Sequence, residues 1–141
     1  MKLPIRVSEE SREPLYHQIE TQLQSLIVSG KLPPGTPLPS IRALASELSC
    51  SVITTRKAYQ NLEGRALIKT IQGKGTFVKE VEEQRKEDTK QQVIVSAFLK
   101  AVEQADQVGS TQAEMKSLFD QALLQYFDNK INKSKGGKED E

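Results

Sequence analysis

The stretch from Pro14 to Val78 constrains the fold more than any other part of the chain, because it carries several secondary-structure signals in a fixed order. Apolar residues recur at three- and four-residue steps up to Val28, which predicts an amphipathic helix. Two further short helices are predicted on either side of Ser49-Cys50, and a hairpin is predicted around the glycines of Gln72-Gly-Lys-Gly75. This order of elements predicts a helix-turn-helix followed by a wing.

Prolines, glycines and serines set the expected limits of these elements. Pro14 fits the first position of the first helix, and Gly30 fits a position just past its end. Four prolines and a glycine between Leu32 and Pro39 predict a rigid connecting turn. Residues 1–13 are polar, and we predict that they are extended. Ser40 and Ser51 are predicted to cap the two helices that follow the connecting turn.

The spacing of apolar residues predicts which faces of the two short helices are buried. The buried positions are expected to be Ile41, Leu44, Ala45 and Leu48 in one helix, and Thr55, Ala58, Tyr59 and Leu62 in the next. Cys50 lies in the turn between them, where we interpret it as a small buried spacer rather than a reactive thiol.

The remaining face of this helix pair, together with the hairpin tip, carries residues suited to DNA contact. Arg56 lies one turn into the second helix, where it can reach a base edge, and arginine is the commonest reader of guanine. The competing interpretations are ordinary solvated side chains, a core position for Ile53, and helix capping for the two serines. The predicted DNA-contacting residues are Ser40, Arg42, Ser51, Val52, Ile53, Thr54, Arg56, Lys57, Lys74 and Gly75.

The charge distribution agrees with this assignment. Residues 1–80 contain 11 Lys and Arg against 7 Asp and Glu, a net charge of +4, whereas residues 81–141 contain 9 against 12, a net charge of −3. The basic part is therefore the part with the helix-turn-helix pattern, as phosphate binding requires.

Other functional classes find little support. Cys50 is the only cysteine, so neither an internal disulfide nor a thiolate metal site is expected. His17 is the only histidine, and the sequence around it suggests neither a metal site nor a catalytic base. No nucleotide-binding loop or nucleophile motif is present, and no apolar run is long enough to cross a membrane. We therefore expect a soluble, cytoplasmic protein without cofactor or catalytic activity.

The composition changes after Lys79. Glu80–Gln92 is almost wholly charged or polar and is interpreted as an exposed helical extension or a linker, and two helical patterns with wide apolar faces follow. About fifty residues cannot bury both faces, so these helices are expected either to fold back on the first domain or to pair with a second copy. We favour pairing, because a two-fold dimer reads a palindrome. The predicted interface residues are Ile94, Phe98, Val102, Leu118, Phe119 and Leu123.

Several motifs in this order resemble the GntR family of bacterial transcription regulators. They are Pro14-Leu-Tyr-His-Gln-Ile19, Gly30-Lys-Leu-Pro-Pro-Gly35, Leu38-Pro-Ser-Ile-Arg-Ala-Leu-Ala45, Ala58-Tyr-Gln-Asn-Leu-Glu63 and Gly73-Lys-Gly-Thr-Phe-Val78. The short C-terminal part is similar to the YtrA subfamily. The resemblance implies a dimeric repressor, often of an ABC-transporter operon, with little room for an effector pocket.

The resemblance also implies DNA contacts by Arg42, by Ser51, Thr54 and Arg56 of the recognition helix, and by Gly75 in the wing. The chain departs from the family pattern in two places. Many relatives have an arginine or a polar residue in place of Val52. Arg65-Ala66 stands where a glycine-containing turn is common, and Gly64 is expected to compensate.

The sequence as a whole predicts a mainly α fold with a small β-hairpin. Residues 1–80 form a winged helix-turn-helix, residues 81–131 a helical dimerisation region, and residues 132–141 a disordered tail. The predicted function is transcription regulation by binding of a homodimer to double-stranded DNA. The alternative is a winged-helix module that binds another protein and has no operator of its own. Control by a small-molecule effector stays open.

Overall fold

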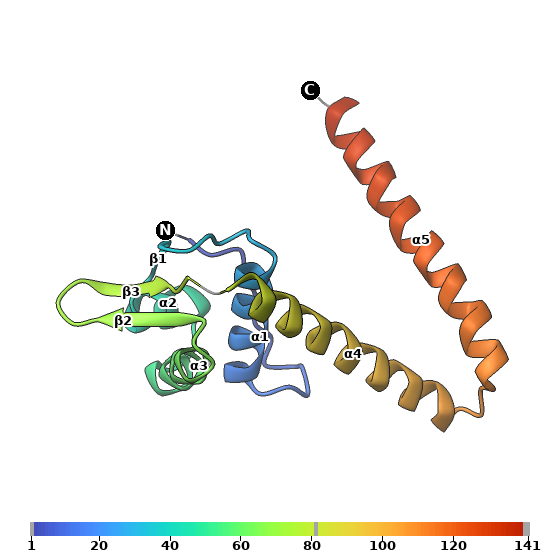
Figure 1. Ribbon diagram of the computed structural model, residues 1–141, viewed down its shortest axis with the longest axis horizontal. Helices are drawn as coiled ribbons and strands as arrows, with labels where there is room; N and C mark the ends of the chain where they lie inside the picture. Colours follow the sequence, from blue (N-terminus) through green and yellow to red (C-terminus); the bar gives the residue numbers. More distant parts are fainter. Residues whose placement is uncertain (1, 81, 140–141) are drawn as a thin grey trace. The chain divides into compact units, whose positions relative to one another are not determined.

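Helices dominate the protein, and a small antiparallel sheet accompanies them, which confirms the predicted fold class. The computed structural model describes residues 2–80 and 82–139. Its elements, in chain order, are α1 (Leu15–Val28), β1 (Pro37–Leu38), α2 (Ile41–Leu48), α3 (Val52–Gly64), β2 (Ile68–Ile71), β3 (Gly75–Val78), α4 (Glu83–Gln107) and α5 (Gln112–Glu139) (Figure 1). The chain divides into two compact units, one ending at Gln92 and the other beginning at Val93.

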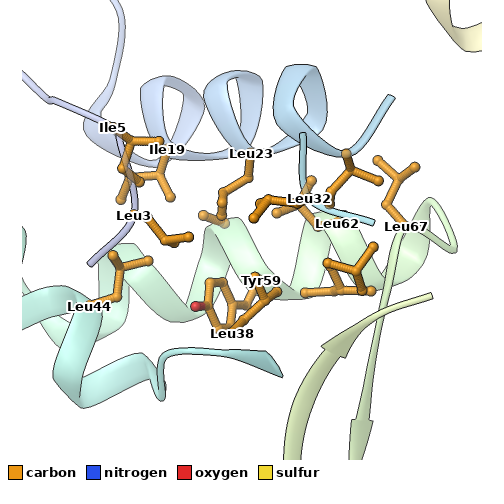
Figure 2. Close-up of a cluster of buried hydrophobic side chains, with 14 residues drawn as sticks. Leu3, Ile5, Ile19, Leu23, Leu32, Leu38, Leu44, Tyr59, Leu62 and Leu67 are labelled. Atoms are coloured by element: carbon orange, nitrogen blue, oxygen red, sulfur yellow. The ribbon is translucent and has the colours of Figure 1, made fainter. Parts of the chain in front are cut away.

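The core of the first unit lies where α1 packs against α3. Ile19 and Leu23 of α1 are fully buried, and they face Tyr59 and Leu62 of α3 (Figure 2). Leu44 of α2 closes one end of this layer. The buried positions predicted for α3 are confirmed, because Thr55, Ala58, Tyr59 and Leu62 are all buried. In α2 the inner pair Leu44 and Ala45 is buried, while Ile41 and Leu48 pack against the core from its edge.

The N-terminal segment contributes to this core, which the sequence interpretation missed. Leu3 and Ile5 are only 4% and 6% exposed, and Figure 2 shows them beside Ile19. Two glutamines of α1 hold the segment through its backbone. The Gln18 side chain accepts from the Ser8 N–H at 2.8 Å and donates to the Ser8 carbonyl at 2.9 Å. Gln22 pairs with the Arg6 backbone in the same way.

The sheet has the strand order β1-β3-β2, with both pairings antiparallel. The predicted hairpin is confirmed as β2 and β3, but β1 lies inside the segment predicted to be only a connecting turn. Leu38 is opposite Thr76 in the register, and the connection is extended by the Gly35 N–H, which donates to the Val78 carbonyl at 2.8 Å. Proline is tolerated in β1 because this strand is at the edge of the sheet.

The predicted helix limits of the first unit are largely confirmed. Ser40 and Ser51 are N-caps, with their hydroxyls accepting from the backbone N–H three residues later. Gly30 adopts a φ of 84° just past α1, as expected. Pro14 is the N-cap of α1 rather than its first helical residue, because its ψ of 149° is extended.

The second unit consists of the rest of α4 and all of α5. No side chain of α4 is buried, and most apolar residues of both helices are exposed, with Ala105 and Met115 half-buried. Phe98 and Phe119 make an edge-to-face contact with 5.2 Å between ring centroids. α4 begins at Glu83, which confirms a helical extension rather than a linker before Val93. The division between the units therefore falls inside a continuous helix.

The C-terminal segment differs from its prediction. Residues 132–139 continue α5 to Glu139, whereas their polar composition predicts disorder. Extending an existing helix adds one hydrogen bond for each residue fixed, so a polar segment can continue a helix that it could not start. Residues 140 and 141 of the predicted tail, and residue 81 at the predicted domain boundary, lie outside the described residues.

The end of α3 carries a local strain that the sequence interpretation assigned differently. Ala66, not a glycine, occupies the left-handed position after the helix, with a φ of 60°. Its N–H donates to the Glu63 carbonyl at 2.9 Å, and the Leu67 N–H donates to the Leu62 carbonyl at 3.0 Å. Gly64 is the last residue of the helix itself, where it cannot compensate as expected. Glycine is thus at a helical position that favours alanine, and alanine is at a left-handed position that favours glycine.

We predict that Ala66→Gly raises the free energy of unfolding by about 0.5–1 kcal/mol, because glycine adopts positive φ without the penalty of an L-residue. Gly64→Ala should add about 0.5–1 kcal/mol through helix propensity, since an added Cβ meets no atom within 4 Å. Urea denaturation measures both. The control is Ala43→Gly on an exposed face of α2, which should destabilise. A loss of stability in Ala66→Gly would contradict the interpretation.

Candidate DNA-binding site

The turn between α2 and α3 sets the start of the recognition helix. Ser49 has a φ of 54°, a left-handed conformation that ends α2, and the Cys50 N–H donates to the Ala45 carbonyl at 3.0 Å. Cys50 is half-buried and packs against the core, with its Sγ 3.2 Å from the Thr55 hydroxyl oxygen. This position agrees with the predicted role of a spacer between the helices.

The first turn of α3 is held by hydroxyl groups. Ser51 Oγ accepts from the Thr54 N–H at 3.0 Å and donates to Thr54 Oγ1 at 2.8 Å. Because both hydroxyls already have partners, they are fixed in orientation while remaining near the surface. Ser51 is exposed, and Thr54 is half-buried beside it.

The first two turns of α3 expose a mixed apolar and basic face. Ile53 is 77% exposed, so the alternative that it belongs to the core is wrong. Arg56 and Lys57 are exposed on the next turn, and Val52 is half-buried. An isoleucine left in water beside two cations is suited to a groove that offers both thymine methyl groups and phosphates.

The start of α2 is tied to α3 through a buried tyrosine. The Tyr59 hydroxyl donates to the Pro39 carbonyl at 2.7 Å. Burial raises the pKa of Tyr59 above its ordinary value, and the Glu47 carboxylate acts in the same direction. The hydroxyl therefore stays protonated as a donor at neutral pH. Ser40 follows directly and caps α2 by accepting from the Ala43 N–H at 3.1 Å, and Arg42 is exposed in the first turn.

The wing is the β2–β3 hairpin, which reaches away from the helices of the first unit (Figure 1). Its turn is closed by the Lys74 N–H, which donates to the Ile71 carbonyl at 2.9 Å. Gly73 and Gly75 have φ values of 80° and 120°, which disfavour any other residue. Lys74 is exposed between them. A tip without side-chain bulk at Gly75 lets the backbone approach a phosphate closely.

A row of polar contacts joins α1 to α3, and the sequence interpretation did not predict it. Tyr16 contacts Lys57, with the ammonium 3.9 Å from the ring centroid. One turn further on, Glu20 accepts from the Asn61 amide at 2.7 Å. Another turn further on, the Arg65 guanidinium donates to Gln24 at 3.4 Å and to Glu20 at 3.1 Å. We call these contacts the α1–α3 polar row.

The spacing of the row shows how the two helices run. Tyr16, Glu20 and Gln24 are each four residues apart, and their partners Lys57, Asn61 and Arg65 have the same spacing. Each pair is 41 positions apart in the sequence. The helices are therefore parallel, so the start of α1 lies beside the first half of the recognition helix. A polar stripe at helical spacing beside the apolar stripe of α1 is the sequence signal that could have revealed it.

Glu20 is the central residue of the polar row, with its side chain only 3% exposed. His17 Nδ1 lies 3.5 Å from the same carboxylate. His17 and Glu20 both belong to α1, and the Glu20 carboxylate also bonds to α3, so this histidine lies at the contact between the two helices. No cluster of three or more His, Cys, Asp and Glu side chains suited to metal binding occurs among the residues that the structure describes.

The comparison with known proteins decides the family. Residues 15–78 match the model of the family described as "Bacterial regulatory proteins, gntR family". YtrA from Sulfolobus acidocaldarius, a solved GntR-family transcription factor, is 37% identical, and the match covers 67% of this chain and 96% of that one with a TM-score of 0.52. The chain belongs to the GntR family. Residues 15–78 are therefore the winged helix-turn-helix DNA-binding domain of that family.

Curated relatives agree with this assignment. The HTH-type transcriptional repressor YtrA of Bacillus subtilis (strain 168) is 38% identical over 76 residues, which are 54% of this chain and 58% of that protein. The chain thus spans less than two thirds of this relative's length. The HTH-type transcriptional regulator YhcF of the same organism is 31% identical over 110 residues, which are 75% of this chain and 87% of that protein.

Within the described residues, no helix is both long and apolar enough to cross a membrane.

We predict that Glu20→Gln lowers the free energy of unfolding by about 1–3 kcal/mol, because hydrogen bonds to a buried charged group are worth more than those to a neutral one. Urea denaturation of the full chain measures the loss. Glu63→Gln is the matched control, since Glu63 is exposed and its carboxylate, within the described residues, accepts from the Thr70 N–H alone, at 3.3 Å. If both variants lose the same small amount, Glu20 does not hold the helices together.

Proposed function

We propose that the protein is a sequence-specific repressor that binds a palindromic DNA operator in the cytoplasm as a homodimer. The observation that carries the proposal is the exposed face of α3. Ile53, Arg56 and Lys57 are in water on a helix whose opposite side is fully buried. A helix held this firmly, with apolar and basic side chains left outside, is suited to insertion into a major groove.

The elements that flank α3 support a second set of contacts. Arg42 on α2 and Lys74 on the wing are exposed cations on either side of the recognition helix in sequence. We assign both to phosphates, because phosphate contacts fix the orientation of a protein on the duplex while base contacts specify its sequence. Gly75 is assigned to backbone approach, and Ser40, Ser51, Val52 and Thr54 to polar and apolar contacts near the helix starts.

Exposed apolar side chains in the second unit support the homodimer. The six predicted interface residues are between 40% and 57% exposed in the single chain. They are Ile94, Phe98, Val102, Leu118, Phe119 and Leu123. Apolar surface of this extent is rare on a soluble monomer and indicates an interface. A second copy presents the same surface, so two-fold pairing covers both. Following the subfamily resemblance, we also propose that the operator controls a transporter operon.

Arg56 and Lys74 should separate base reading from phosphate binding. We predict that Arg56→Ala weakens binding by about 1–3 kcal/mol per half-site and broadens sequence preference. Lys74→Ala should weaken all duplexes about equally and lower the slope of log affinity against log salt. Binding is measured with a duplex selected from a random pool, at several salt concentrations. Lys130→Ala, on α5, makes the same change of charge outside the DNA-binding unit.

The outcomes also separate this function from a module that binds another protein. Such a module would show no salt-dependent affinity for any duplex. Unchanged affinity and unchanged preference in Arg56→Ala would mean that α3 presents a different face to the DNA.

The dimer is tested by light scattering on the full chain at micromolar concentration. We predict the mass of two chains for the wild type, and the mass of one chain for Phe119→Asp, because a charge cannot be buried unpaired in an apolar interface. Gln121→Asp, on the same helix, introduces the same charge and should leave the dimer intact. A wild-type mass of one chain would contradict the proposed pairing.

A further inference from the structure

The α1–α3 polar row treats its two cations differently. Arg65 donates to the Glu20 carboxylate at 3.1 Å, so its charge is compensated within the protein. Lys57 instead lies over the ring of Tyr16, with its ammonium 3.9 Å from the centroid. In the part of the chain that the structure describes, the Glu20 carboxylate pairs with Arg65 at 3.1 Å and lies 3.5 Å from His17, and neither contact involves Lys57. Lys57 is thus positioned by a neutral group, and within the described residues no carboxylate pairs with its ammonium.

The ring that holds Lys57 is itself fixed. Tyr16 is half-buried and packs against the core of the first unit. Two residues later in α1, Gln18 is buried and hydrogen-bonded to the N-terminal segment. An aromatic face with little freedom restricts the long side chain of the lysine, which would otherwise lose rotamer entropy on binding.

The position of the pair matches the expected DNA surface. Lys57 is exposed and directly follows Arg56 on the first half of α3. Because α1 and α3 run parallel, Tyr16 lies at the end of α1 that is beside this half. A cation at the edge of a helix inserted in the major groove is close to the phosphates that border the groove.

We infer that Tyr16 is a positioning residue for DNA binding, which holds the Lys57 ammonium for a phosphate contact without cancelling its charge. The inference rests on the proposed function and deepens it, because it assigns to α1 a part in DNA binding. Tyr16 acts through Lys57 and does not read a base.

A double-mutant cycle on the full chain tests the inference, with Tyr16→Leu, Lys57→Met and the double variant. The probe is a duplex selected from a random pool by the wild type, titrated at several salt concentrations. Tyr16→Leu keeps an apolar side chain but removes the ring face. The cation–π contact favours the positioned lysine by about two- to fivefold, and this is the most that its loss can cost at one half-site. An operator with two half-sites counts the effect twice, so we expect binding weaker by up to about four- to twenty-fivefold.

Lys57→Met should lower the slope of log affinity against log salt by about one for each half-site, and Tyr16→Leu should shift the slope in the same direction. In the Lys57→Met background, Tyr16→Leu should have no further effect on affinity. Tyr16→Phe retains the ring and should bind as the wild type does. Lys57→Arg, in which a guanidinium can stack on the ring, should retain most of the affinity. Melting temperatures of all variants report any loss of fold.

Several results would overturn the inference. The inference is wrong if Tyr16→Leu weakens binding equally with and without Lys57, or if it leaves the salt slope unchanged. It is also wrong if Tyr16→Leu tightens binding or binds as Tyr16→Phe does. If Tyr16→Leu fails to fold, the comparison of Tyr16→Phe with Lys57→Met decides, because a loss of affinity in Tyr16→Phe would assign the role to the hydroxyl. A wild type that binds no duplex would instead remove the proposed function, and the inference with it.

Discussion

The buried carboxylate of Glu20 is the constraint on which the DNA-binding unit depends. A charge removed from water is costly unless it is paired and hydrogen-bonded. Glu20 meets this condition only when Asn61 and Arg65 of α3 lie at hydrogen-bond distance, at 2.7 and 3.1 Å. The apolar contacts between α1 and α3 tolerate small shifts, but the polar contacts do not. The polar group therefore fixes the register of a helix pair that hydrophobic packing brings together.

The other elements are fastened to this helix pair one by one. Tyr59 of α3 holds the start of α2 through the Pro39 carbonyl, and β1 joins the same connection to the wing through β3. The recognition helix, the first helix of the motif and the wing thus share one rigid base. Side chains that are to meet a duplex can be placed on such a base with little reorganisation, which limits the free-energy cost of binding.

Local signals explain what the sequence could predict. The serine caps, the helical apolar spacing and the glycines at 73 and 75 each act within a few residues, and the structure agrees with them. Contacts between distant segments were missed for the same reason. Leu3 and Ile5 form too short an alternation to stand out, β1 is two residues long, and Glu20 looks like any surface glutamate. Whether the exposed residues of α3 and of α4–α5 touch DNA and a second copy depends on partners that no single chain contains.

The pairing of β1 with β3 has a consequence for the order of folding. The β2–β3 hairpin closes through a short turn, whereas Leu38 meets Thr76 only after the chain has passed through α2 and α3. Closing that long loop costs chain entropy, and the favourable contacts of the strand pair form only after the loop is closed. The edge strand should therefore add last, after the helices have brought its two ends together. The wing would then complete its third strand in the final step, so a nascent chain released before Val78 would contain the recognition helix without the sheet that braces it.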